Sequence, residues 1–217
     1  MEEAARQDPE EVAPPEYLGV YDRQYFEGGA AVSSYASYAS CRDILYLWAA
    51  MLDRVFRPQR VLDVAAAYGF VVDWFTRMGV AAVGVEPSEW ALSQRVTPNI
   101  IRGWLPDQIP HMPSSDLVVC TECLEHIPTR DVPHSLDRLA NLTRRPDGHL
   151  VLLIMLAGHP TAHDDAGHLT LESREWWEAQ LEGTGMVPDL QAEERLNNHP
   201  TSEHMMWTGR IFVRKWP

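Results

Sequence analysis

The sequence is poor in lysine and cysteine. It has one lysine, Lys215, and three cysteines, Cys41, Cys120 and Cys123. A phosphate-binding P-loop needs the pattern G-K-S or G-K-T, and the chain has neither, so P-loop nucleotide chemistry is excluded. Three unevenly spaced cysteines do not make a disulfide framework, and residues 1–16 lack the apolar segment of a signal peptide. We therefore expect a protein of the reducing cytoplasm.

Long apolar runs and positive charge are scarce as well. No stretch approaches the roughly 18 consecutive apolar residues of a transmembrane helix, so we expect no membrane association. The formal net charge of −13 repels phosphate backbones, which disfavours nucleic acid as a partner. No internal repeat stands out. The expected assembly is a monomer or a homodimer.

The length suits one α/β domain and is too short for two comfortable ones. Residues 1–16 are acidic and contain prolines, so we expect a disordered tail there. Residues 17–57 are expected to form a helical lid or support, because 42–56 place apolar side chains at helical spacing. The main domain is expected over 58–217.

Strand and helix patterns alternate along the main domain. Strands are expected near 60–64, 80–87, 99–103, 114–120, 149–158, 187–196 and 207–216. Helices are expected at 70–79, 88–96, 132–145 and 172–185, with Ser88 as the N-cap of the second. The run over 149–158 is continuously apolar, as in a strand that is buried on both faces. The pattern predicts a parallel sheet covered by helices on both sides.

The turn after the first strand, residues 65–69, consists mainly of small residues. In an open parallel sheet, ligands bind beyond the carboxyl ends of the strands, and small side chains let a ligand approach the backbone. A dinucleotide site needs G-x-G-x-x-G, but the three glycine places hold Ala65, Ala67 and Phe70. Phe70 would obstruct a pyrophosphate. The turn therefore favours a nucleoside-like ligand without a phosphate chain.

Glu86 ends the second strand, about 20 residues after this turn. A carboxylate at that place can accept hydrogen bonds from both hydroxyl groups of a ribose. The alternative interpretation is an acid in a solvated loop. The position of Glu86 favours the ribose-binding role.

Four segments resemble motifs of the class I S-adenosylmethionine-dependent methyltransferases: VLDVAAAYGF, AVGVEPSEWAL, DLVVCTECLEHIP and LTRRPDGHLVLLI. A further segment, GHLTLESREWWEAQLEGTGM, resembles the late helix of the small-molecule, bacterial natural-product type. The resemblance runs from about residue 58 to the C-terminus. It implies a Rossmann-like three-layer α/β sandwich, with helices on both faces of a mostly parallel seven-stranded sheet and an antiparallel C-terminal strand.

The chain departs from the family at two positions of the first motif. The family has glycine at positions 65, 67 and 69, and only Gly69 is glycine here. Alanine adds a methyl group and prefers a negative φ. Because alanine is the smallest replacement, we still expect the turn to form.

The resemblance also implies a cofactor, S-adenosylmethionine, and the residues that bind it. Asp63 and the turn would hold its methionine part, Glu86 its ribose, and Trp104 and Leu105 would flank its adenine. The complete expected set is Tyr25, Asp63, Ala65, Ala66, Ala67, Gly69, Glu86, Pro87, Ser88, Trp104, Leu105, Cys120, Thr121 and Glu122.

Polar side chains crowd into residues 120–126, at the end of a strand. Cys120, Cys123 and His126 form a C-x-x-C-x-x-H pattern, but structural zinc usually takes four ligands in two pairs, and no second pair exists. A redox dithiol needs an exposed thiolate. Metal binding and redox chemistry are thus the less favoured alternatives, and we expect no metal site. By the resemblance, the cysteines are small residues beside the cofactor, and His126 either fixes the loop or acts on the substrate as a base.

A second polar cluster follows the expected strand over 149–158. It contains His159, His163, Asp164, Asp165 and His168. In the family that the chain resembles, this loop often covers the substrate, which makes His168 a candidate general base. The alternatives are a polar surface loop capped by His168, and a cation held by His163, Asp164 and Asp165.

Residues 17–40 are rich in tyrosine and small residues. We expect them to pack over the cofactor as a lid anchored by Tyr21, Tyr25 and Phe26, or else to support the sheet. The expected function is O-methylation of a small molecule, aromatic or glycosylated, in bacterial natural-product tailoring. The alternatives are a catalytically degenerate S-adenosylmethionine-binding scaffold or regulator, and an RNA methyltransferase.

Overall fold

The computed structural model describes residues 15–28, 37–160, 162, 165, 167–199 and 210–217. The expected disordered tail over 1–16 lies outside these residues, except for its last two positions. His163 and Asp164 of the polar loop also lie outside them, as does the beginning of the strand expected over 207–216.

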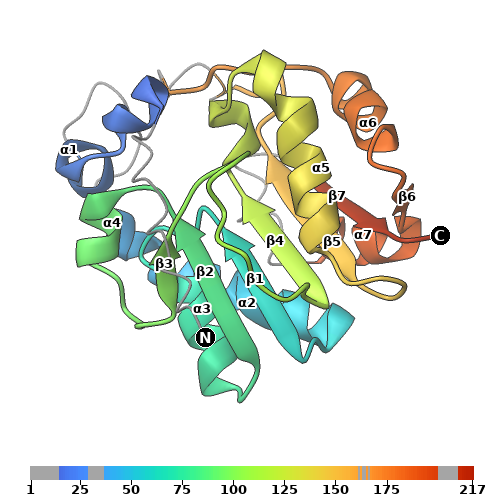
Figure 1. Cartoon of the computed structure of the whole chain (residues 1–217), viewed down its shortest axis with the longest axis horizontal. Helices are drawn as coiled ribbons and strands as arrows, with labels where there is room; N and C mark the ends of the chain where they lie inside the picture. Colours follow the sequence, from blue (N-terminus) through green and yellow to red (C-terminus); the bar gives the residue numbers. More distant parts are fainter. Residues whose placement is uncertain (1–14, 29–36, 161, 163–164, 166, 200–209) are drawn as a thin grey trace, which may run out of the picture.

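The described residues contain one seven-stranded sheet, in the order β3-β2-β1-β4-β5-β7-β6 (Figure 1). Its strands are β1 (Arg60–Val64), β2 (Ala81–Glu86), β3 (Ile100–Arg102), β4 (Leu117–Thr121), β5 (His149–Ile154), β6 (Val187–Pro188) and β7 (Arg210–Lys215). The first five strands are parallel, and β7 is antiparallel to both β5 and β6. This confirms the expected Rossmann-like α/β fold. The strand order reverses between β1 and β4, so their carboxyl ends border the crevice where such sheets bind ligands.

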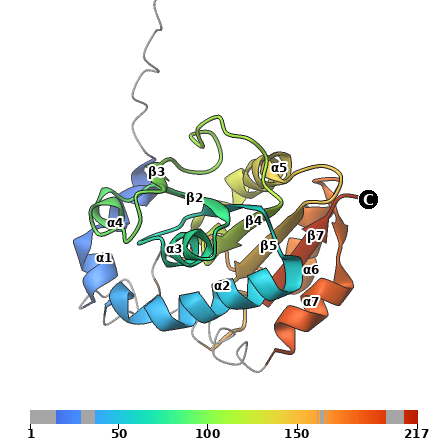
Figure 2. The same ribbon diagram turned by 90° about the horizontal axis from the view of Figure 1, so that it is seen from below.

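Helices cover both faces of the sheet. They are α1 (Arg23–Glu27), α2 (Arg42–Phe56), α3 (Phe70–Arg77), α4 (Glu89–Ser93), α5 (Val132–Leu142), α6 (Arg174–Glu182) and α7 (Leu190–Asn197). Side chains of α2, α3 and α7 pack in one core, and those of α5 and α6 pack in the other. Figure 2 shows α2 and α7 below the sheet and α5 above it. Within the described residues, no helix has both the length and the apolar character that crossing a membrane requires.

The two cores explain why the central strands are continuously apolar. In β5, Leu150 and Leu152 contact the core of α5 and α6, whereas Val151 and Leu153 contact the core of α2 and α3. All four side chains are buried. Successive side chains of a strand point to opposite faces, so a strand between two helical layers needs an apolar residue at every position. This packing fixes the strand ends that carry the site.

The strand expected over 187–196 is wrong beyond its first two residues. The chain leaves the sheet after β6, and α7 begins, with Asp189 as its N-cap accepting a hydrogen bond from the Ala192 N–H at 3.2 Å. Ala192 and Leu196 are four residues apart, which places both on one face of a helix. Both are buried in the core of α2 and α3.

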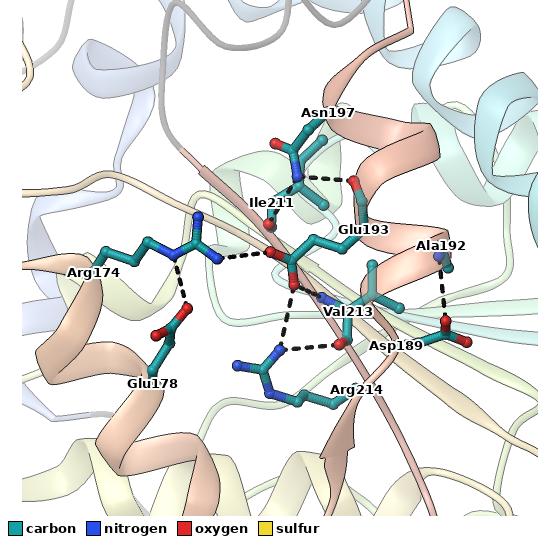
Figure 3. A network of polar contacts seen from close by, with 9 residues as sticks. All are labelled: Arg174, Glu178, Asp189, Ala192, Glu193, Asn197, Ile211, Val213 and Arg214. Atoms are coloured by element: carbon teal, nitrogen blue, oxygen red, sulfur yellow. Dashed lines mark hydrogen bonds and ion pairs between the residues drawn. The ribbon is translucent and has the colours of Figure 1, made fainter.

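A buried ion-pair network joins α7 to its neighbours (Figure 3). The Glu193 carboxylate accepts hydrogen bonds from Arg174 at 3.0 Å and from Arg214 at 3.4 Å. It also accepts one from the backbone N–H of Val213 at 3.3 Å. Arg174 lies in α6 and Arg214 in β7, so a single carboxylate connects three elements. The buried charge is tolerated because these partners replace its hydration.

Replacing Glu193 with alanine should lower the free energy of unfolding by about 3 kcal/mol, because the buried Arg214 loses its partner. Urea denaturation measures the change. The matched control is Glu194→Ala on the exposed side of the same helix, with an expected effect below about 0.5 kcal/mol. Equal effects of the two substitutions would show that the network does not stabilise the fold.

Candidate active site

A cavity lies at the carboxyl ends of β1, β2 and β4, and residues of α1 form part of its wall. Its polar residues include Asp63, Glu86, Thr121, Glu122 and His126. The rest of its lining includes a set of aromatic residues, which are Tyr17, Tyr21, Tyr25, Phe26, Tyr38, Phe70 and Trp104. The cavity thus combines carboxyl groups with flat apolar surfaces.

Most residues that the sequence assigned to the cofactor line this cavity. They are Tyr25, Asp63, Ala65, Ala66, Ala67, Glu86, Pro87, Trp104, Leu105, Thr121 and Glu122. The exceptions are Gly69, Ser88 and Cys120. Gly69 precedes α3, Ser88 caps α4, and Cys120 is buried in the core of α5 and α6. These three residues support the residues that form the wall.

The alanine-rich turn forms in spite of its missing glycines. Ala65 and Ala67 have φ angles of 65° and 48°, in the left-handed region that alanine disfavours. Three hydrogen bonds hold the turn: the N–H groups of Ala65 and Ala66 donate to the Val85 carbonyl at 2.9 and 3.0 Å, and the N–H of Gly69 donates to Ala66 at 2.8 Å. We infer that these contacts offset the strain of the two alanines.

Glu86 fastens the turn to the end of β2. One oxygen of its carboxylate accepts a hydrogen bond from the Ala67 N–H at 2.7 Å. The other accepts one from the Ser88 N–H at 2.8 Å. Each carboxylate oxygen has a second lone pair, so Glu86 retains acceptor capacity at the cavity. The alternative interpretation, an acid in a solvated loop, is therefore wrong, because Glu86 is a buried side chain held by two hydrogen bonds.

Burial gives the two neighbouring acids unusual protonation behaviour. Burial, with a smaller effect of nearby Glu86, raises the pKa of Asp63 to about 8. Burial also raises the pKa of Glu86 to about 7, although its two backbone hydrogen bonds act in the opposite direction. In the folded protein without ligand, both groups hold protons in a range where an exposed carboxyl group is ionised.

The Cys120 thiol of the C-x-x-C pattern does not have the properties of a reactive thiol. The hydrogen bond between Cys120 and Cys123, together with burial, raises the pKa of the Cys120 thiol. A protonated, buried thiol is neither a good metal ligand nor a nucleophile. Cys123 lines the cavity, as the interpretation of a small residue beside the cofactor expects, whereas Cys120 lies in the core next to it.

The segment that the sequence predicts to be a lid is attached to two parts of the domain. The Ser88 hydroxyl donates to the backbone carbonyl of Tyr21 at 2.5 Å. Tyr25 donates to Asp165, in the loop after β5, at 3.2 Å. Tyr21, Tyr25 and Phe26 all lie on the cavity wall, and Figure 1 shows α1 beside α4. The described part of the predicted lid therefore borders the site, whereas α2 packs against the sheet.

The two candidate bases lie next to each other. His126 lines the cavity and its ring is 4.7 Å from that of His168, which lies behind it in the loop after β5. Burial lowers the pKa of His126 to about 4, so its imidazole is neutral near pH 7. His168 donates from Nδ1 to the Ala162 carbonyl at 2.7 Å, because a carbonyl can only accept.

Sequence reasoning missed Glu125, which directly precedes His126. Its side chain is fully buried, and one carboxylate oxygen accepts a hydrogen bond from the Met155 N–H at 3.0 Å. The backbone carbonyl of Glu125 accepts from the N–H groups of Leu169 and Thr170 at 2.8 and 2.9 Å. Glu125 thus joins the turn after β4 to the loop after β5. The acid was visible in the segment LEHIP, but its burial depends on that distant loop.

Replacing Ala65 or Ala67 with glycine should raise the free energy of unfolding by up to about 1 kcal/mol, because glycine adopts a positive φ without strain. Urea denaturation measures the change. Ala66→Gly is the control from the same turn, where φ is not positive, and it should destabilise by about 0.5–1 kcal/mol. A loss of stability in all three variants would contradict the strain argument.

The raised pKa values predict a pH dependence of stability. A carboxyl group with a raised pKa binds more protons in the folded state than in the unfolded state, so stability falls as the pH rises from about 4 to about 8. The asparagine of Asp63→Asn cannot ionise. Between pH 5 and about 7.5, the free energy of unfolding of wild type should therefore fall by about 1 kcal/mol more per pH unit than that of this variant. Urea denaturation across this range measures both slopes. The control Asp107→Asn, at an exposed position, should have the same pH dependence of stability as wild type. If the curves of stability against pH for wild type and Asp63→Asn were parallel, the raised pKa of Asp63 would be refuted.

Comparison with known proteins identifies the family. The chain matches the family model described as "Methyltransferase domain" over residues 33–201. No curated protein sequence gives a significant match. Solved structures do: a SAM-dependent methyltransferase from Archaeoglobus fulgidus has a TM-score of 0.58 at 16% identity, covering 80% of this chain and 94% of that chain.

Two further structures share the fold. Magnesium protoporphyrin IX methyltransferase (ChlM) from Synechocystis PCC 6803, with bound SAM, has a TM-score of 0.56 at 15% identity, covering 83% of this chain and 80% of that chain. A methyltransferase in complex with the Trm112 activator from Haloferax volcanii has a TM-score of 0.55 at 17% identity, covering 80% and 97%. These identities establish the shared fold, and the family match spans most of the chain. The chain belongs to the class I S-adenosylmethionine-dependent methyltransferases.

Proposed function

We propose that this protein transfers a methyl group from S-adenosylmethionine to a hydroxyl group of a small aromatic molecule. The observation that carries the proposal is the cavity at the strand ends, where oriented carboxyl groups face a set of aromatic rings. Natural-product tailoring in a bacterial cytoplasm is the setting that we propose for this reaction. The free thiols of the described cysteines suit that reducing compartment.

The residues of the cavity fit the cofactor. The free lone pairs of Glu86 would accept hydrogen bonds from the ribose hydroxyl groups. Trp104 offers a flat surface for the adenine, and Asp63 with the alanine turn would hold the methionine part. Glu86, Asp63 and Glu122 give this pocket a carboxyl-rich lining, which suits a ligand with a sulfonium and an ammonium group.

When bound, S-adenosylmethionine supplies a methyl group whose bond to sulfur breaks as the acceptor oxygen bonds to carbon, with the electron pair staying on sulfur. The protein has to align the acceptor at about 3 Å from the methyl group and exclude water. Tyr21, Tyr25 and Phe26 would exclude water from above. His126 and His168, beside the floor of the cavity, would orient the hydroxyl group and receive its proton.

The aromatic wall favours a planar acceptor. Tyr21, Tyr25 and Phe26 meet edge to face, with ring centroids 4.8 and 5.2 Å apart. Such rings offer both flat faces and positively polarised edges to another aromatic ring. One structural relative, magnesium protoporphyrin IX methyltransferase, is named for a planar macrocycle. The net charge of −13 disfavours RNA as the acceptor.

Titration calorimetry of the purified chain with S-adenosylmethionine and S-adenosylhomocysteine should give micromolar affinity for both. Glu86→Ala should lower the affinity for each ligand by at least about tenfold, since hydrogen bonds to a charged acceptor contribute about 1.5–3 kcal/mol each. The control is Glu89→Ala, an exposed acid in the next helix, which should bind like wild type. A thermal melt of each variant separates lost binding from lost folding.

Absence of binding by wild type at millimolar ligand would refute the proposal and favour a scaffold. If the cofactor binds, mass spectrometry of incubations with phenolic compounds should detect the gain of one methyl group. Binding without methyl transfer to any hydroxyl compound, but with transfer to RNA, would support the rival acceptor class.

A further inference from the structure

Three possible metal ligands meet beside the floor of the cavity. A carboxylate oxygen of Glu125 and one ring nitrogen from each of His126 and His168 lie within 4.8 Å of one another. Glu125 and His126 belong to the short 3₁₀ helix Leu124–His126 after β4, and His168 to the loop after β5. In the described part of the chain, no other group of three histidine, cysteine or acidic side chains comes this close.

Two of these side chains are buried with an atom that has no hydrogen-bond partner. Glu125 is 0% exposed, and its Oε2 has no partner, although Oε1 accepts from the Met155 N–H. His126 is 8% exposed, and its Nδ1 has no partner either. A buried polar atom without a partner costs about 1–3 kcal/mol, so two of them in one cluster require an explanation.

The third side chain presents a lone pair. The Nδ1 of His168 donates its proton to the Ala162 carbonyl at 2.7 Å, so in the neutral imidazole Nε2 is the acceptor. A backbone carbonyl that fixes the tautomer through the second ring nitrogen is the usual arrangement for a metal-ligating histidine.

We propose that Glu125, His126 and His168 bind a divalent transition-metal ion at the edge of the proposed cofactor cavity. Two imidazoles and a carboxylate are a ligand set that suits Zn²⁺, Fe²⁺, Co²⁺ or Mn²⁺ better than Mg²⁺ or Ca²⁺, which prefer oxygen ligands. Binding at about 2.1 Å from each atom would draw the three side chains somewhat closer together.

Electrostatics at the cluster favour a cation. Neither lysine nor arginine is among the described residues that line the cavity. A divalent ion would supply the missing positive charge. Sequence patterns placed His126 in a different and less favoured metal pattern, because the three ligands proposed here come from two loops that are about 40 residues apart.

Three protein ligands leave coordination positions open, which is characteristic of catalytic metal sites. Because His126 lines the cavity, an open position would face the acceptor. This role rests on the proposed function, whereas the binding of the ion does not. A Lewis acid at this place would favour loss of the hydroxyl proton to solvent, so the histidines would act as ligands rather than as bases.

The first test is metal binding by the full chain after removal of metals with a chelator. Titration with Co²⁺, followed by visible absorption, and with Zn²⁺ and Mn²⁺, followed by calorimetry, should show one site per chain. His168→Ala and Glu125→Gln should each weaken binding by at least about tenfold, in line with the loss of one ligand. The control is His111→Ala, an exposed histidine far from the cluster in sequence, which should bind like wild type.

The test separates the two proposals. Glu125 is fully buried and His168 is only half-buried, so His168→Ala is the deciding variant, and a thermal melt verifies its fold. No binding by wild type, or equal binding by wild type and His168→Ala, would overturn the metal site. Titration with S-adenosylhomocysteine in the presence of chelator tests the cofactor pocket independently, so either proposal can fail while the other stands.

Discussion

The carboxylate of Glu86 connects the parts of the molecule that have to meet at the site. It bonds to the turn after β1 through the Ala67 N–H and to the start of α4 through the Ser88 N–H. Ser88 in turn holds the segment predicted to be a lid, through the carbonyl of Tyr21. The strand that carries Glu86 ends inside the sheet between β1 and β3, so its position is set by packing on both faces. A side chain that is oriented this firmly before any ligand arrives lowers the entropic cost of binding.

The same contacts explain how a first motif with two alanines still closes. The loss of glycine at positions 65 and 67 strains the backbone, but the turn has hydrogen bonds to both the backbone and the side chain at the end of β2. Gly84 in β2 leaves space beside the turn. A Cβ at this position would lie 2.7 Å from the Cβ of Ala66, so a larger residue at position 84 would clash with Ala66. This space serves Ala66 and is separate from the strain at positions 65 and 67.

Sequence patterns predicted the fold well where one local rule dominated. β1, β2, β4 and β5 follow from continuous apolar runs, and α2 begins and ends at the expected residues. The pattern failed at α7, because the segment contains few apolar residues, and its helical state depends on Asp189 as a cap and on Glu193 as a bridge to distant arginines. The cavity lining was largely predictable, since parallel strands deliver their ends to one edge. The cluster around Glu125 was not, because only the fold brings the loop with His168 to the end of β4.

One electrostatic property unites the candidate site. Asp63, Glu86 and Glu125 are buried acids at the ends of three strands or the turns beside them, and burial raises the pKa of each. Proteins usually pair buried acids with a basic residue, as this one does for Glu193, which accepts hydrogen bonds from Arg174 and Arg214. Here the described cavity wall supplies backbone N–H groups and aromatic rings instead. A positively charged ligand would favour the ionised form of these acids and supply the partner that arginine supplies for Glu193. We propose two ligands of that kind: S-adenosylmethionine, with its charged methionine part at Asp63 and its ribose at Glu86, and a metal ion at Glu125.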